Sequence, residues 1–269
     1  GQIDTLEGCT SISDTDGSLL FYSDGSTVWN RNHQIMLNGI GLKGDDSSTS
    51  SGLIVPKPQD ADFYYIFTVD EPHHNNVTGS AETPANDGVN DGLTYSRINI
   101  LDDNGLGAVD AVEKNISLIT YDTSDPLQVD LKCSEKITAV KADDCSSFWL
   151  ITHFADTFYA FKIDENGVNS TPVTSTVGPY IPIEGYRRNA LGYLKASPDG
   201  TKLISANFGE STVLGEDAGG GIYLYDFNND TGIVSNSVEL YSPQNNNSPY
   251  GVEFSAENKK AYATIGLGA

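Results

Sequence analysis

Two stretches of the sequence share one pattern and decide the fold: ITAVKADDCSSFWLITH at Ile137–His153 and LGYLKASPDGTKLISAN at Leu191–Asn207. Each reads as a strand, a polar turn and a second, more apolar strand. No stretch of the chain carries apolar residues at helical spacing over three turns. Three further segments repeat the pattern: Thr10–Tyr22, Leu53–Val69 and Tyr250–Thr264. The repeat predicts an all-β fold built from hairpins.

The spacing of the copies leaves room for two more strands in each repeat, as in Thr157–Ile163 followed by Val168–Thr176. Four strands per repeat are typical of a β-propeller blade. The sequence therefore predicts a single β-propeller domain over residues 1–269, with about four and a half four-stranded blades. A Pro-, Asn- and Gly-rich stretch at about residues 70–92 is expected to be an insertion loop.

A propeller protects its sheet edges by closing a ring of complete blades. A chain that ends half-way through a blade, and begins at Gly1 without a Met, is therefore expected to be incomplete at both ends. We expect the parent propeller to have seven blades.

The charge of the chain narrows the classes of partner. It has 37 acidic and 15 basic side chains, which gives a formal net charge of −22. Nucleic acid is excluded as a partner, because its phosphates need Lys and Arg to displace their counterions. Anionic membrane surfaces are disfavoured for the same reason. No apolar run approaches the roughly 18–20 residues of a membrane span, so direct membrane insertion is not expected.

A near-continuous series of stretches resembles one known family. The series begins with Thr5–Cys9 (TLEGC), Leu19–Gly25 (LLFYSDG) and Thr27–Gln34 (TVWNRNHQ), and continues in Leu53–Pro58, Leu150–His153 and Tyr250–Ser255. It looks like the N-terminal β-propeller of large bacterial surface proteins that the type-nine secretion system exports, which are associated with gliding motility. The resemblance implies export, an extracellular or cell-surface location, contact with the type-nine secretion machinery and a role in adhesion. It assigns no catalytic reaction.

Several residues are candidates for ligand binding. Trp29, Arg31 and His33 lie in the most specific part of the resemblance, and His153 ends an apolar strand. For each histidine two interpretations stay open: it faces a central channel, where propellers often bind ligands, or it packs within its blade. Charged residues occupy what the pattern makes matching positions at the end of the first strand of a blade: Lys57, Lys141, Lys195 and Glu253. They would form a charged rim for an anionic ligand, or simply face solvent.

Two acidic turns suggest calcium as a cofactor, because they place hard oxygen ligands close together: Asp14 with Asp16, and Asp102 with Asp103. Neither completes a calcium-loop motif. Asp also favours such turns for backbone reasons alone. No other cofactor is predicted.

We interpret the chain as a non-catalytic recognition, adhesion or assembly module, whose partners would be glycans or other surface proteins. Two alternatives come from other classes. One is a hydrolase or lactonase acting at the channel mouth. The stretch Ser197–Leu203 (SPDGTKL) weakly resembles lactonase-type propellers. The other is a structural subunit of a surface filament or complex, in which a strand from the next chain completes the open blade.

Overall fold

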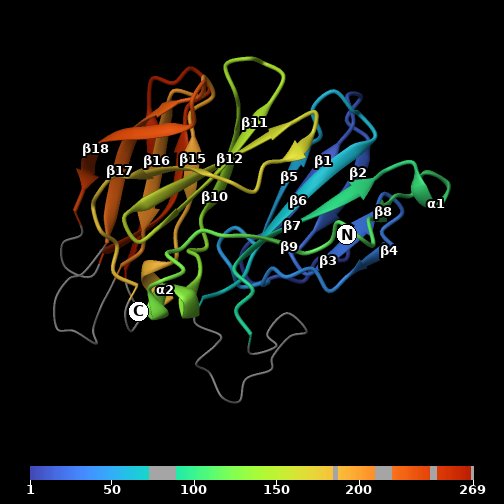
Figure 1. Cartoon of the computed structure of the whole chain (residues 1–269), viewed down its shortest axis with the longest axis horizontal. Helices are drawn as coiled ribbons and strands as arrows, with labels where there is room; N and C mark the ends of the chain where they lie inside the picture. The colour runs from blue at the N-terminus through green and yellow to red at the C-terminus, as the bar shows by residue number, and fades with distance from the viewer. Residues whose placement is uncertain (73–88, 184–186, 210–219, 243–246, 268–269) are drawn as a thin grey trace. The chain divides into compact units, whose positions relative to one another are not determined.

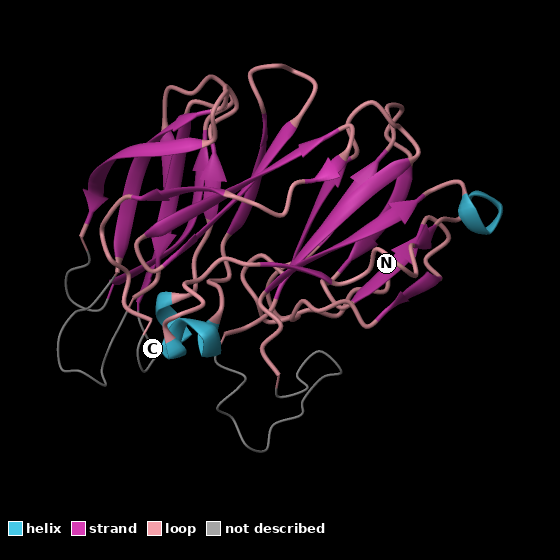
Figure 2. Ribbon diagram, in the orientation of Figure 1, coloured by secondary structure: helices cyan, strands magenta, loops and turns pink. Residues whose placement is uncertain are grey.

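The computed structural model describes residues 1–72, 89–183, 187–209, 220–242 and 247–267. The chain divides into two compact units, Gly1–Ile119 (unit 1) and Thr120–Ala269 (unit 2), and each is described by itself. Strands dominate both units, and the helical turns are short (Figure 2). No helix in the described part of the chain is long and apolar enough to cross a membrane.

Unit 1 contains two antiparallel sheets in chain order. The first is formed by β1 (Thr10–Ser13), β2 (Leu19–Ser23), β3 (Thr27–Asn30) and β4 (Ile35–Ile40). The second is formed by β5 (Gly52–Pro56), β6 (Phe63–Val69) and β7 (Leu93–Asn99), with β8 (Ala108–Val109) and β9 (Ile116–Leu118) both paired to β7. A parallel bridge from Leu37 to Ala108 joins the two sheets at β4 and β8. The short turn α1 (Asp102–Gly105) lies between β7 and β8.

Unit 2 repeats the arrangement (Figure 1). After α2 (Pro126–Leu131), one sheet is formed by β10 (Ile137–Lys141), β11 (Phe148–Phe154) and β12 (Thr157–Asp164), with β13 (Gly167–Val168) and β14 (Val173–Thr176) sharing its outer position. The next follows the 3-10 turn η2 (Arg187–Asn189) and is formed by β15 (Leu194–Ala196), β16 (Lys202–Asn207), β17 (Gly221–Asn228) and β18 (Ile233–Tyr241). A hairpin of β19 (Asn247–Phe254) and β20 (Ala261–Leu267) ends the described chain.

This strand order confirms the predicted fold class. Each sheet runs from its first to its last strand in chain order, which is the topology of a β-propeller blade. The chain is all-β and contains about four and a half such blades, with the outer strand split in two of them. The first strands of successive sheets are neighbours: β1 and β5 in unit 1, and β10, β15 and β19 in unit 2.

The cores lie between neighbouring sheets. In unit 1, Phe21, Met36 and Ile66 belong to one cluster that joins both sheets. In unit 2, Trp149 and Ile151 of the β10–β14 sheet pack with Leu203 and Tyr225 of the β15–β18 sheet. A separate cluster places Ile204 and Ala206 against Val252 of the hairpin. Residues of β16 thus alternate between two cores, as expected for a strand that is buried on both faces.

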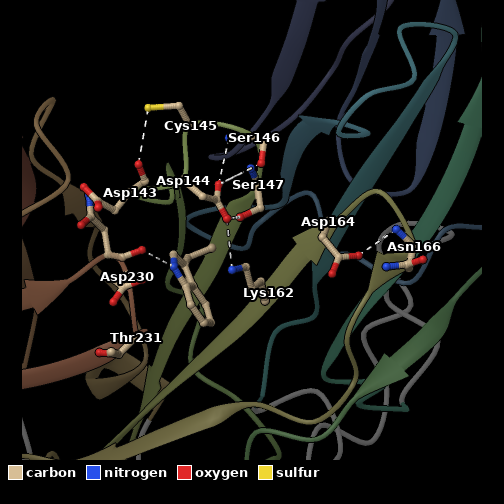
Figure 3. Close-up of polar contacts among 12 residues, drawn as sticks. Asp143, Asp144, Cys145, Ser146, Ser147, Lys162, Asp164, Asn166, Asp230 and Thr231 are labelled. Carbon is tan, nitrogen blue, oxygen red and sulfur yellow. Dashed lines mark hydrogen bonds and ion pairs between the residues drawn. The ribbon is translucent and has the colours of Figure 1, made fainter.

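Aspartates hold the turns between the first and second strands of three sheets, at Asp14, Asp144 and Asp199. Asp144 accepts hydrogen bonds from the backbone N–H groups of Ser146 and Ser147, each at 2.8 Å, and from the Ser147 hydroxyl at 2.6 Å (Figure 3). The Lys162 ammonium lies 3.2 Å from the same carboxylate and over the Trp149 ring. These bonds lower the pKa of the Asp144 carboxyl. Asp and Ser in the turn therefore have a structural explanation.

The predicted equivalence of the charged residues is wrong at two positions. A backbone hydrogen bond closes each β-turn: Ala142 to Ser147, Ser197 to Lys202, Ser255 to Lys260, and Lys57 to Phe63. Lys195 and Glu253 both lie two residues before the turn-closing residue, but Lys141 lies one before it and Lys57 is that residue itself. A one-residue shift moves a strand residue to the opposite face. The turn that Lys57 closes is one residue longer than the other three, and the turn near Lys141 begins one residue sooner after the lysine than the turn near Lys195 does. The apolar pattern revealed neither difference.

The predicted insertion at about residues 70–92 joins β6 to β7, and a backbone hydrogen bond from Asp70 to Gly92 closes its base. Residues 73–88 of this loop lie outside the described residues.

Gly232 provides a test of the packing at the β17–β18 turn. Its φ is +77°, and a Cβ atom there would lie 2.7 Å from the Trp149 ring. Gly17 has a similar φ of +85° but no atom within 4 Å of the Cβ position. We expect Gly17→Ala to cost about 1 kcal/mol of unfolding free energy, from backbone strain alone. Gly232→Ala should cost roughly 2–4 kcal/mol, because overpacking against Trp149 is added.

Urea denaturation of both variants measures the difference. Equal losses at the two glycines would show that the Trp149 ring moves aside and that the predicted overpacking is absent.

Candidate functional site

A buried cation lies where β10 begins. Lys136 is 1% exposed, and its ammonium donates to the backbone carbonyls of Ala190 (2.6 Å), Leu191 (2.9 Å) and Asn189 (3.3 Å). An ammonium group has three N–H donors, so these carbonyls use all of them. Burial lowers the pKa of Lys136, and the neighbouring Glu135 opposes that shift. Lys136 thus links the first strand of one sheet to the segment that leads into β15.

His153 lies beside this cation. Its ring is 2% exposed and packs on Phe158, with the ring centroids 4.5 Å apart. Burial, together with the charge of Lys136, lowers the pKa of His153 to about 3. The imidazole is therefore neutral at pH 7, and its pKa lies far from the value near the operating pH that suits a general base.

Polar atoms gather at this end of unit 2 without hydrogen-bond partners. They include Nε2 of His153, Oγ of Ser205 and both amide atoms of Asn207. Strand alternation places all three side chains between the β10–β14 and β15–β18 sheets, because Ile151 and Leu203 pack in the shared core. Each of these atoms has less than 1 Å² of accessible area. These atoms are therefore not accessible to a ligand in this structure, and the three side chains lie in the interface between the two sheets.

The corresponding end of unit 1 is acidic. Desolvation is the main cause that raises the pKa of Asp70 to about 7, and Asp45 and Asp91 add to it. Desolvation and the charges of Asp45 and Asp24 raise the pKa of Asp46 to about 6. The Asp70 carboxylate accepts from the backbone N–H groups of Glu71 (2.8 Å) and Asp91 (2.6 Å). These acids hold loop backbone in place.

An open pocket of about 430 Å³ lies on the first sheet of unit 1, lined in part by Ser11, Tyr22 and His33. The rings of Tyr22 and Trp29 stack with centroids 5.5 Å apart and planes at 17°. The His33 ring lies 5.7 Å from that of Tyr22, and its Nδ1 is 3.2 Å from the Tyr22 hydroxyl. Two of the predicted binding residues, Trp29 and His33, are thus brought together by Tyr22.

Of the predicted binding residues in the described part of the chain, only His33 lines this pocket, whereas Trp29 stacks on Tyr22 outside the lining. Arg31 is exposed in the turn between β3 and β4. Lys57 pairs with Asp60 at 3.1 Å, and Lys195 lies 3.9 Å from Glu253. Both pairs are accessible to solvent and contribute little to stability. Lys141 is exposed at the end of β10. A rim of like charge does not form at Lys57 and Lys195, because each has an acidic partner.

The predicted calcium ligands are occupied within their own turns. Asp14 accepts from the Ser18 backbone N–H at 2.8 Å, and Asp102 accepts from the Asn99 amide at 3.1 Å. Asp16 and Asp103 are exposed. Within the described ranges, no group of three His, Cys, Asp or Glu side chains lies close enough to hold a metal ion. Calcium stays a prediction.

Sequence reasoning missed Tyr22 and Lys136. Tyr22 alternates with the core residue Phe21 on β2, so strand periodicity alone would have placed it on the opposite face, beside Trp29. The adjacent charges of Glu135 and Lys136 directly before an apolar strand were the available signal for a buried pair.

No family model and no curated protein matches the chain. Among solved structures it is similar to the periplasmic gluconolactonase of Pseudomonas aeruginosa, with 12% identity and a TM-score of 0.45, over 96% of this chain and 61% of that one. It is also similar to the Cps50 (Swd1) β-propeller domain of Myceliophteria thermophila, with 12% identity and a TM-score of 0.46, over 93% and 64%. A protein from Lactobacillus plantarum matches with 13% identity and a TM-score of 0.44, over 97% and 62%. The chain spans less than two thirds of the length of each, and at this similarity none bears on function.

The shifted pKa values predict that acid affects the two units in opposite directions. His153, with its pKa lowered from 6.5 to about 3, stabilises unit 2 above pH 6.5 and loses that contribution as pH falls toward 3. Asp70, with its pKa raised from 3.8 to about 7, stabilises unit 1 below pH 3.8 and loses that contribution as pH rises through 7. Lowering the pH from 7 to 4 should therefore weaken unit 2 and strengthen unit 1.

Native-state hydrogen exchange, corrected for intrinsic rates, reports β6 and β11 separately. His153→Gln should flatten the response of β11, and Asp70→Asn that of β6. A change of the same sign in both units would contradict the assignment of these two groups.

Proposed function

We propose that this chain is a non-catalytic recognition module, a β-propeller segment of a larger exported surface protein that binds a glycan. The pocket lined by Tyr22 and His33, with Trp29 stacked on Tyr22 outside the lining, is the observation that carries the proposal. At about 430 Å³ it lies within the usual range of ligand sites.

The chemistry of the pocket suits a neutral sugar. A sugar ring presents an apolar face, which packs on aromatic rings, and hydroxyl groups, which need donors and acceptors. Tyr22 is only 4% exposed, so the ring that the pocket offers for stacking is the exposed one of His33, with hydroxyl groups from Thr10 and Ser11 beside it.

The location proposed for the protein rests on the sequence. The resemblance to propellers of type-nine-secreted surface proteins supports export, and contact with that secretion machinery would follow. A net charge of −22 suits an exterior facing the medium. Digestion of intact cells with a protease tests the location: an exported protein is cleaved before the cells are broken.

A glycan array with the purified protein tests the recognition. We expect binding of a neutral glycan that falls about two- to tenfold in His33→Asn, since stacking on one aromatic ring contributes about 0.5–1.5 kcal/mol. Asn32→Ala is the matched control, because Asn32 is exposed in the same turn but does not line the pocket. Equal loss in the control, or no glycan bound by a protein folded by circular dichroism, would contradict the proposal.

A hydrolase or lactonase is the first alternative, and a screen of lactones and esters tests it. His33, His153 or an acidic pair would carry that reaction, and for His153 its burial and its pKa of about 3 do not favour the role of a base. Turnover that His153→Ala abolishes would replace the recognition proposal by the hydrolase.

A structural subunit, in which a strand from the next chain completes the open blade, is the second alternative. Among the described residues, β20 pairs with β19, and it carries Tyr262 and Ile265 at 58% and 46% exposure. Edge strands of this kind accept an added strand from another chain. Light scattering that shows ordered oligomers, lost in Ile265→Lys, would support assembly.

A further inference from the structure

A second cavity, of about 400 Å³, lies beside the outer strand of the first sheet. Its lining is mixed: Ile35, Met36 and Ile40 of β4 and Ala111 supply the apolar part, and Asn38, Gly39 and Lys114 complete it. Ile35 and Ile40 are 51% and 61% exposed, although most large apolar residues of the chain are buried. The cavity shares no lining residue with the aromatic pocket.

One charged side chain lines this cavity. The Lys114 ammonium donates to the backbone carbonyls of Ile40 at 2.6 Å and Asn38 at 2.9 Å. An ammonium has three N–H groups, so two bonds leave one donor. No carboxylate of the described residues forms an ion pair with Lys114, in a chain with 37 acidic side chains.

The two carbonyl bonds have an explanation in the fold, and the remaining donor of this partly exposed ammonium is open to solvent or to a ligand. Lys114 and Asn115, whose amide donates to the Gly41 carbonyl at 2.8 Å, cap the outer edge of β4 against pairing with another strand. That role is complete with two bonds from Lys114. Partial burial lowers the pKa of Lys114, as expected for an ammonium that has lost part of its hydration.

We propose that this cavity binds a small monocarboxylate with an apolar chain. The carboxylate accepts the remaining N–H of Lys114, and the chain lies on Ile35, Ile40 and Ala111. The match is one of charge and of surface: a single cation at the end of an apolar wall selects one anionic group with a hydrocarbon attached. This site is independent of the proposed glycan pocket.

Met36 makes the test direct, because it is the single methionine of the chain and lines the cavity. Its ¹³C-labelled methyl group gives one NMR signal that reports this site. Titration with hexanoate should shift the signal in a saturable way. Hexan-1-ol, which has the same chain without the charge, should bind about tenfold or more weakly, since a charge-assisted hydrogen bond contributes about 1.5–3 kcal/mol.

Two variants separate the cation from the wall. Lys114→Gln should weaken hexanoate about tenfold and leave hexan-1-ol unchanged, whereas Ala111→Phe should block both. Lys259→Gln is the matched control, because Lys259 is exposed and pairs with Glu257 in unit 2. If Lys114→Gln unfolds, Ala111→Phe decides, because it leaves the carbonyl bonds of Lys114 in place.

Three results would overturn the proposal: no saturable shift of the Met36 signal, equal affinity for hexanoate and hexan-1-ol, or full binding in Ala111→Phe. Loss of glycan binding in the His33 variant with hexanoate binding retained would show that the two sites are separate.

Discussion

Burial of both faces of each sheet is the constraint on which this structure depends. A strand such as β16 carries Leu203 into one core and Ile204 into the next, so its sheet is stable only with a neighbour on either side. The hydrophobic area that one sheet buries is therefore supplied by another sheet of the same kind. This explains why the chain repeats one four-stranded unit, and why short turns with Asp and Ser suffice to connect the strands.

The same constraint buries backbone at the end of each sheet where its first strand begins. Backbone groups of the entering loops are buried there and need hydrogen-bond partners. Unit 2 answers with a cation, because the Lys136 ammonium takes three carbonyls of the segment before β15. Unit 1 answers with carboxylates, because Asp70 takes the N–H groups of Glu71 and Asp91. Opposite charges thus perform equivalent structural work in the two units.

The sequence allowed the fold to be predicted because apolar runs and turn residues report strand faces directly. It placed Trp29 and His33 among the candidate residues, but not Tyr22, which links them. The predicted match of Lys57, Lys141 and Lys195 failed because register depends on which residue closes each turn, and the turn after Lys57 spans one residue more than the others. The buried roles of Lys136 and His153 depend on carbonyls and rings from distant segments, which a linear pattern does not place.

The chain has 15 basic against 37 acidic side chains, so the partner of each basic side chain is informative. Arg97 holds Asp110 and Glu113, Lys202 holds Asp226, and Lys162 holds Asp144. These cations pair with carboxylates within the fold. The acidic side chains in excess of the basic ones give the chain its net charge of −22. Lys114 differs from these cations, because no carboxylate of the described residues pairs with it and it lines a cavity with the exposed Ile35 and Ile40. In an acidic protein, the surrounding negative field favours pairing of each cation with a carboxylate. A cation without such a pair is therefore a better guide to a binding site than any one carboxylate is.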